Sequence, residues 1–252
     1  MYLEICIGIS LAVGTVASYV PQFHNIVKSQ SVKSISELSL ILLNLASMFL
    51  TVNLLIFSWD VFSCSPFTGE CFSALLPFLD VTISWLVNLI YYLIFITFKI
   101  KNREKRCISG LQYSIVYLLF AIIIIILSLT EKMQNNRAFF RIYQEVLGIA
   151  SAVLNGLVYL PQIITLLKNK EIGSNSIIMY ALQTPGNLLI IFYQAIMFRV
   201  PISTWLTFVI VFCQQLIILI ILIYLHFKKK REDQRLQSYA GLAIDVEEDR
   251  YF

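Results

Sequence analysis

The stretch YVPQFHNIVKSQSVKSIS, Tyr19 to Ser36, places a proline and a glutamine side by side within an otherwise apolar segment. A second stretch, YLPQIITLLKNKEIGSNS, Tyr159 to Ser176, repeats this arrangement at an offset of 140. At that offset the tyrosine, the Pro-Gln pair, the following lysine and two serines coincide, and upstream Gly8 aligns with Gly148. Two unrelated apolar helices would not share this many identities, so the pattern indicates an internal repeat.

The composition around these stretches is that of a membrane protein. Of the 252 residues, 58% are hydrophobic and only 13% are charged, whereas a soluble globular domain is about 45–50% apolar and about 25% charged. The mean hydropathy of +0.78 agrees. A water-exposed surface needs more charge than this chain has, so we predict an integral membrane protein.

Segments without Asp, Glu, Lys or Arg divide the chain into seven predicted membrane spans. A helix needs about 20 residues to cross the hydrocarbon, and each segment is near or above that length. The third is short, and we expect it to extend backward past Asp80 towards Pro77, which would place that carboxylate within the span. The charge-free segments are 5–27, 38–59, 81–98, 107–130, 146–167, 172–198 and 200–227.

The repeat pairs spans one to three with spans five to seven, and span four is left over. The third spans correspond more weakly, at an offset of 120 that aligns Trp85 with Trp205. One extra span gives both three-helix units the same orientation across the bilayer. The sequence therefore predicts an all-α membrane protein with seven transmembrane helices, arranged as two parallel three-helix-bundle repeats joined by a linker helix (3+1+3). The predicted parts are a first repeat at 4–98, a region at 99–142 comprising a basic cytosolic loop, the linker helix at about 108–130 and a lumenal loop, a second repeat at 143–227, and a disordered polar tail at 228–252.

The basic residues near the span ends are unevenly shared between the two sides. Fourteen lie on one side and four on the other, which predicts a lumenal or exterior amino terminus and a cytosolic carboxyl terminus. The positive net charge reflects this bias, and we expect no nucleic-acid partner. The side with fourteen holds Lys28, Lys33, Lys99, Lys101, Arg103, Lys105, Arg106, Lys168, Lys170, Lys228, Lys229, Lys230, Arg231 and Arg235, and the other holds Lys132, Arg137, Arg141 and Arg199.

Polar residues recur on one face of each span except the fourth. Amides are costly in hydrocarbon unless they find partners or water, so these faces predict either a shared substrate pathway or hydrogen bonds that only hold the helices together. A matched set in both repeats favours the pathway. The predicted pathway residues are Thr15, Tyr19, Asn44, Ser47, Asn88, Tyr91, Asn155, Tyr159, Gln183, Asn187 and Gln214.

Asp80 is the acidic residue that we expect inside a span. An intramembrane carboxylate is a candidate for proton coupling; the alternative is an interfacial position at the lumenal end of its helix. On the same side, Cys64 and Cys71 in CSPFTGEC are candidates for a disulfide in an oxidising compartment, with two free thiols as the alternative.

The two Pro-Gln pairs are predicted gating hinges. Proline removes a backbone hydrogen bond within a helix, so a helix can bend there, and matched hinges in both halves suit alternating access. Static kinks that only shape packing are the alternative. The hinge candidates are Pro21, Gln22, Pro161, Gln162 and, in the sixth span, Pro185 and Gly186.

The spans contain no catalytic set of residues, so we expect neither an enzyme nor a cofactor. His24 and His226 are the only histidines, and two separated imidazoles make a poor metal site. In the tail, Tyr239 and Leu242 match the tyrosine-x-x-bulky form of an endolysosomal sorting signal, which predicts sorting adaptors as partners.

Paired Pro-Gln motifs at the cytosolic ends of the first and fifth spans, each followed by a basic, serine-containing loop, resemble the PQ-loop repeat family. That family includes cystinosin and the lysosomal and vacuolar amino acid exporters and, more distantly, the SWEET sugar transporters and the KDEL receptor. The resemblance covers about residues 4–227. It implies proton-coupled export of a small polar solute, such as an amino acid, from a lysosome or vacuole. We expect no large glycosylated lumenal domain like that of cystinosin, so the resemblance does not imply cystine. A sugar transporter and a non-transporting ligand or sorting receptor on the same scaffold are the alternatives, whereas the internal repeat counts against a G-protein-coupled receptor.

Overall fold

The computed structural model describes residues 2–30, 32, 35–62, 64, 68–101, 119, 122, 126, 137–169 and 175–248, and its regular elements there are all helices. Five helices are long and apolar enough to cross a membrane. In chain order the elements are α1 (Tyr2–Ser29), α2 (Glu37–Phe57), α3 (Trp59–Phe62), α4 (Gly69–Lys101), α7 (Arg137–Asn169), α8 (Ile177–Phe192), the π-helix η1 (Tyr193–Met197) and α9 (Ile202–Glu248).

The sixth predicted span corresponds to α8 and η1 together. The α-helix has 16 residues and the π-helix adds 5, enough to cross about 30 Å of hydrocarbon. Regular helix runs through Pro185 and Gly186, and the irregular backbone comes later, at η1. The predicted linker helix at 108–130 lies outside the described residues, except that Leu119, Ile122 and Ile126 are helical and exposed.

Equivalent residues begin the second helix of each repeat. The side chain of Ser36 accepts a hydrogen bond from the backbone N–H of Ser39, and that of Ser176 accepts one from Met179. Such an N-cap stabilises a helix by about 1 kcal/mol. Because these two serines coincide in the sequence repeat, that repeat is also a repeat in local structure.

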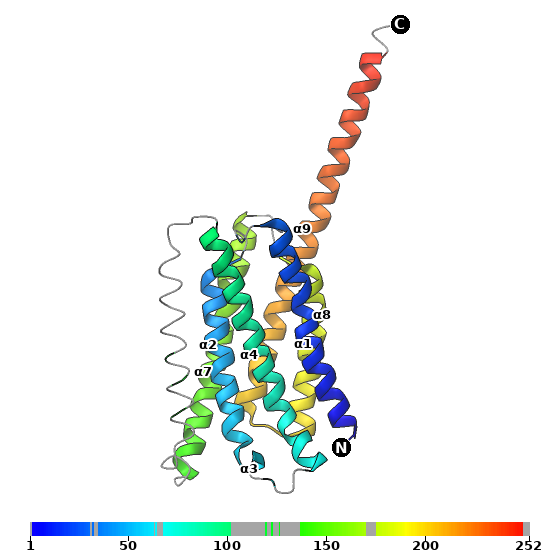
Figure 1. The fold of residues 1–252 in the computed structure, drawn as a ribbon. Helices are drawn as coiled ribbons and strands as arrows, with labels where there is room; N and C mark the ends of the chain where they lie inside the picture. Colours follow the sequence, from blue (N-terminus) through cyan, green and yellow to red (C-terminus); the bar gives the residue numbers. More distant parts are fainter. Residues whose placement is uncertain are drawn as a thin grey trace.

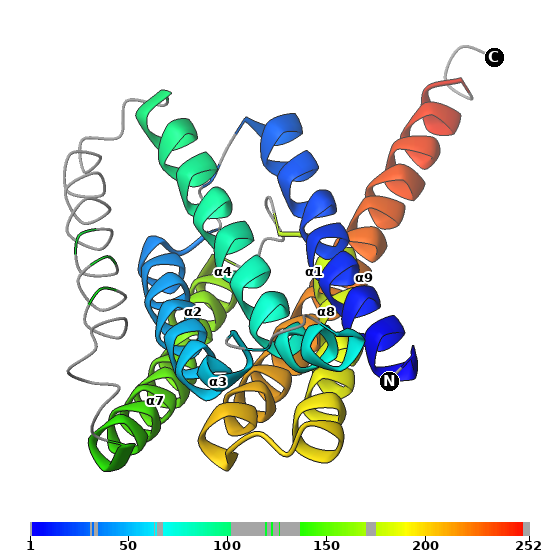
Figure 2. The same ribbon diagram turned by 60° about the horizontal axis from the view of Figure 1, so that its bottom comes forward.

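Six long elements form a closed ring in the order α1, α4, α2, α7, α9 and α8, and each packs on the next (Figures 1 and 2). The helices of each repeat form one bundle, in which the third helix lies between the first and the second. The two bundles meet where α1 packs on α8 and where α2 packs on α7. We call the end where α1, α4 and α7 terminate the PQ end; the amino terminus and α3 lie at the opposite end (Figure 1).

The two bundles are related by matched contacts near the end opposite the PQ end. The Asn53 side chain donates a hydrogen bond to the carbonyl of Gln144 at 2.7 Å. The equivalent residue of the second repeat, Tyr193, donates one at 3.3 Å to the carbonyl of Glu4, which is the equivalent of Gln144 in the first. Gly8 permits the close approach of α1, because a Cβ there would lie 2.6 Å from the Tyr193 hydroxyl oxygen. The duplicated positions therefore bring the two repeats together through equivalent contacts.

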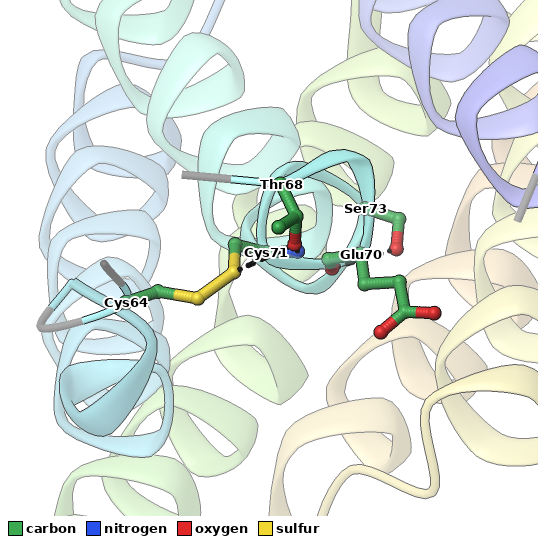
Figure 3. Close-up of a disulfide and its surroundings, with 5 residues drawn as sticks. All are labelled: Cys64, Thr68, Glu70, Cys71 and Ser73. Carbon is green, nitrogen blue, oxygen red and sulfur yellow. Dashed lines mark hydrogen bonds between the residues drawn. A yellow bond between two sulfur atoms is a disulfide. The ribbon is translucent and has the colours of Figure 1, made fainter. Parts of the chain in front are cut away.

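A disulfide joins Cys64 to Cys71 and ties the segment after α3 to the first turn of α4 (Figure 3). Thr68, just before α4, accepts a hydrogen bond from the backbone N–H of Cys71 at 3.4 Å, which is the geometry of a helix N-cap. The third span therefore begins at Gly69 and passes through Pro77.

The prediction of a disordered tail from residue 228 is wrong for most of that segment. α9 continues as a helix to Glu248, and Figure 1 shows it projecting beyond the ring at the PQ end. Extending an existing helix avoids the cost of nucleation, and an i,i+4 pair between Lys228 and Glu232 supports the extension. Polar composition alone therefore gave the wrong result, because the preceding span already supplies helical turns.

Candidate functional site

A cavity of about 310 Å³ lies inside the ring and is lined by all six helices. Most of the predicted pathway residues line it. The predicted site residues on its wall are Thr15, Tyr19, Ser47, Asp80, Asn88, Asn155, Tyr159, Gln183, Pro185, Gly186 and Asn187. Three predicted residues, Asn44, Tyr91 and Gln214, are not on that wall, although each bonds between neighbouring helices. The polar faces therefore serve both as a cavity lining and as links between helices.

In the first repeat, Asn88 on α4 organises the polar wall. Its side-chain oxygen accepts a hydrogen bond from the Tyr19 hydroxyl of α1, and its amide nitrogen donates one to Ser47 of α2 at 3.1 Å. The Asn44 side-chain amide donates to the backbone carbonyl of Asn88 at 3.2 Å. One asparagine thus connects all three helices of the bundle.

In the second repeat the corresponding centre is Gln215, which the sequence pattern did not single out. Its amide nitrogen donates to the Tyr159 hydroxyl at 2.9 Å and to Gln183 at 3.0 Å, and its oxygen accepts from Asn187 at 2.7 Å. Gln183 also donates to Ser18 of α1 at 3.1 Å. The network therefore joins the second bundle to the first.

The helical spacing could have identified Gln215. It lies eleven residues, about three turns, after Thr204, whereas Gln214 lies about 80° round the helix from Thr204. Gln214 instead donates to the carbonyl of Gly156 at 2.6 Å. The repeated tyrosines bond to Asn88 and Gln215. At the depth of these two networks, the third helices of the repeats therefore align Asn88 with Gln215, an offset of 127 residues. The alignment of Trp85 with Trp205 in the sequence gives an offset of 120.

Asp80 lies on the cavity wall and is only 3% exposed. Of the two positions considered from the sequence, the structure shows the buried one, eleven residues into α4 and about 16 Å along the helix axis. The Thr15 side chain of α1 bonds to the carboxyl group, and the oxygen Oδ1 has no hydrogen-bond partner among the described residues. Among the described residues that line the cavity, Asp80 is the one acidic side chain, and no Lys, Arg or His lies on the wall.

Aromatic side chains close the six-helix bundle between this cavity and the PQ end. The rings of Tyr19, Phe23 and Tyr91 pack on one another with centroids 5.9 to 6.1 Å apart. Tyr159 and Tyr180 are buried in the same apolar cluster. Lys99 and Glu37 form an ion pair beside this cluster that joins α4 to α2. Closely packed aromatic side chains therefore separate the cavity from this end of the ring.

The two Pro-Gln glutamines exchange partners between the repeats. Gln22 of the first repeat accepts a hydrogen bond from the backbone N–H of Ser176, at the start of α8, at 2.8 Å. Gln162 of the second repeat accepts one from the backbone N–H of Ser36, at the start of α2, at 3.0 Å. Gln22 also donates to Tyr91 at 3.2 Å. We call the contacts with Ser176 and Ser36 the reciprocal caps; they link both bundles across the PQ end.

The wall of the cavity is open between α1 and α8. Gly14, Leu182, Pro185 and Leu189 line the cavity, and all four are exposed on the outer surface. A Cβ at Gly14 would meet no atom within 4 Å. Along α1, Gly14 lies one turn before Ser18, and Gln22 lies one turn after it. The opening and the reciprocal caps therefore lie on opposite sides of the Ser18–Gln183 hydrogen bond. The cavity therefore extends to exposed residues of α1 and α8.

The sorting-signal candidate lies in the extension of α9, where Tyr239 and Leu242 are helical. Their side chains are outside the described part of the chain. That role stays a prediction.

The PQ-loop repeat family model matches the chain twice, over residues 3–63 and 143–201. The matched regions contain the first two spans of each repeat, the Pro-Gln pairs and the helix starts that the glutamines cap. A comparison with curated protein sequences gives no match. The chain is therefore an integral, multi-pass membrane protein of the PQ-loop repeat family.

Proposed function

We propose that the chain is a transporter that carries a small polar solute through the six-helix ring by alternating access. The observation that supports this most directly is the cavity itself, since helices of both repeats contribute its polar wall. Its volume of about 310 Å³ is at the lower end of the range for ligand pockets, about 300 to 1,000 Å³. The solute is accordingly small.

An amino acid is the solute class that fits this wall. A buried carboxylate at Asp80 can pair with an ammonium group, while the amides of Asn88, Asn187 and Gln215 can bond to a carboxylate or a polar side chain. Leu11, Ile190 and Phe208 supply apolar contact. A sugar would use the amides and hydroxyl groups but would have no need of a buried carboxylate.

The transport cycle uses movement at the PQ end. Opening that end requires the reciprocal caps to break and the tyrosine cluster to separate. Pro21 and Pro161 lie one residue before the capping glutamines, so bending of α1 and α7 at these prolines would move the caps directly. Pro185 and Gly186 lie at the α1–α8 opening and act as the third hinge.

The direction of transport is outward from an acidic organelle such as a lysosome or vacuole, with protons coupled through Asp80. The positive-inside bias favours a cytosolic PQ end. A proton taken up by Asp80 from the acidic lumen would cross together with the solute, because a protonated carboxyl group can still accept a hydrogen bond from the solute's ammonium group.

The test is solute flux by the full chain directed to the plasma membrane, where the lumenal side faces the medium. We expect uptake of at least one amino acid that increases as the medium is acidified. Absence of flux for a broad panel of amino acids and sugars under every pH gradient would refute transport and favour a receptor. Flux of sugars without flux of amino acids would show that the solute is a sugar.

Two variants separate the roles of the residues. Asp80→Asn should remove the pH dependence while exchange or binding persists, and an unchanged pH profile would refute coupling through Asp80. Replacement of both Pro21 and Pro161 by alanine should slow transport more than it weakens binding; normal turnover would show that these prolines only shape packing.

A further inference from the structure

A second hollow lies at the PQ end, on the outside of the ring between α1, α8 and α9. Its volume is about 680 Å³, and it shares no lining residue with the solute cavity. Apolar side chains form its floor, and polar side chains lie along its walls. The residues that matter for its chemistry are His24, Asn25, Ile178, Ile223, His226 and Phe227. We call this hollow the outer groove.

Each of the two long walls of the outer groove carries a histidine with a lysine one turn further on. Lys28 follows His24 by four residues on α1, and Lys230 follows His226 by four residues on α9. Residues at this spacing lie on the same helix face. Both histidines and both lysines are exposed. Two cationic side chains therefore flank the groove mouth from opposite walls.

The charge at this mouth belongs to a particular face of α9. Lys230 lies three residues after Phe227 and seven after Ile223, both of which line the groove. Lys228, two residues earlier, lies about 160° round the helix from Lys230. It pairs with Glu232 at 3.8 Å. The groove therefore has its own basic residue on α9, separate from the neighbouring lysine.

The apolar part of the groove lies at the edge of the membrane-spanning segment. The exposed fractions of Ile178, Ile223 and Phe227 are 61%, 38% and 58%. Ile223 and Phe227 directly precede the basic run that starts at Lys228, and Ile178 lies in the first turn of α8. Apolar side chains below and lysines above are the two surfaces that a phospholipid needs, one for its acyl chains and one for its phosphate.

We propose that the outer groove binds an anionic phospholipid from the leaflet at the PQ end. Its phosphate groups contact Lys28 and Lys230, the imidazoles of His24 and His226 donate or accept hydrogen bonds at the headgroup, and the acyl chains lie on Ile178, Ile223 and Phe227. Because α1 and α9 belong to different bundles, a bound lipid bridges the two bundles. It does so beside the reciprocal cap at the start of α8. The charge of the mouth selects an anionic lipid over a zwitterionic one.

The test measures lipid binding to the detergent-solubilised full chain by native mass spectrometry. The probes are dioctanoyl phosphatidylinositol 4-phosphate, dioctanoyl phosphatidylcholine and soluble inositol 1,4-bisphosphate. The first should bind at least tenfold more tightly than the other two. The double variant Lys28→Gln/Lys230→Gln should weaken it roughly 30-fold, on the basis of about fivefold for each lysine at a membrane surface.

The matched control is Lys101→Gln/Lys228→Gln, which removes the same charge at the same end but away from the groove. It should change the affinity less than threefold. Lys28→Arg/Lys230→Arg should keep binding and shows that the sites tolerate substitution. Equal losses in the two glutamine double variants would overturn the proposal in favour of general electrostatic attraction. Equal affinity for phosphatidylcholine, or for the soluble headgroup, would also overturn it.

Discussion

The reciprocal caps give the sharpest prediction for the gate. Gln22 is completely buried and Gln162 is 4% exposed, and each accepts a hydrogen bond from a backbone N–H at the start of a helix in the other repeat. Replacement of either glutamine by alanine leaves that N–H without its side-chain acceptor while the PQ end is closed. In an open conformation the same N–H can bond to water, so the substitution penalises the closed conformation selectively.

The size of the effect follows from the burial of these groups. A buried donor that loses its partner costs about 1–3 kcal/mol, and about 1.4 kcal/mol is a factor of ten in an equilibrium. Each single variant should therefore raise the open fraction about tenfold or more. The two caps converge on adjacent residues, because Gln162 also donates to Asn175 at 2.9 Å and Gln22 accepts from Ser176. We therefore expect the double variant to fall short of the product of the single effects.

The assay is the labelling rate of a cysteine on the cavity wall. Ser47→Cys, in a chain whose Cys6, Cys107 and Cys213 are replaced by serine, is treated with a membrane-impermeant maleimide applied at the PQ side. The rate should rise about tenfold in Gln22→Ala and in Gln162→Ala, in proportion to the open fraction.

Gln214→Ala is the control for this assay, since Gln214 bonds the backbone of Gly156 within one repeat and should destabilise the fold without opening the gate. Equal labelling in the wild type and both cap variants, or an equal rise in the control, would show that the caps do not hold the gate closed.

Three further predictions concern stability in detergent, measured as thermal unfolding. Gly8→Ala should destabilise by about 1–3 kcal/mol because its Cβ would lie 2.6 Å from Tyr193; Gly14→Ala, with no atom within 4 Å, should be neutral or gain up to about 1 kcal/mol, and equal losses would contradict the packing argument. Removing the disulfide by Cys64→Ser should cost about 2.5 kcal/mol from loop entropy, and an unchanged midpoint under non-reducing conditions would contradict this. Asn53→Leu should cost about 1–3 kcal/mol because the buried Thr204 hydroxyl loses its acceptor, while the backbone carbonyl of Gln144 loses only its additional side-chain donor; a loss equal to that of Thr204→Val alone would show that Asn53 adds nothing.

Local and periodic features of the chain were predictable from the sequence. The family, the all-helical class and the repeat offset depend on composition and on identities at fixed spacing, and the equivalence of Ser36 and Ser176 follows from that offset. Most of the polar wall was predictable as well, because residues three, four or seven apart share a helix face.

The misses arose where neighbouring positions compete or where a helix continues. Gln214 and Gln215 are adjacent in the sequence, and the orientation of α9 in its bundle decides which one reaches the cavity. In the tail, polar composition predicted disorder, but the span before it supplies a formed helix from which α9 extends.

Two copies of one three-helix unit in a membrane can be inferred from the linear chain alone, because hydropathy and the constant offset between the Pro-Gln stretches are properties of residue order. How the copies meet is a property of the folded ring. Gln22 bonds Ser176 and Gln162 bonds Ser36, and nothing in the spacing of either motif identifies a partner in the other repeat. Asp80 likewise became a cavity residue only when α1 packed on α4. Such contacts depend on which helices become neighbours in the ring, and that is set by side-chain packing over the whole bundle.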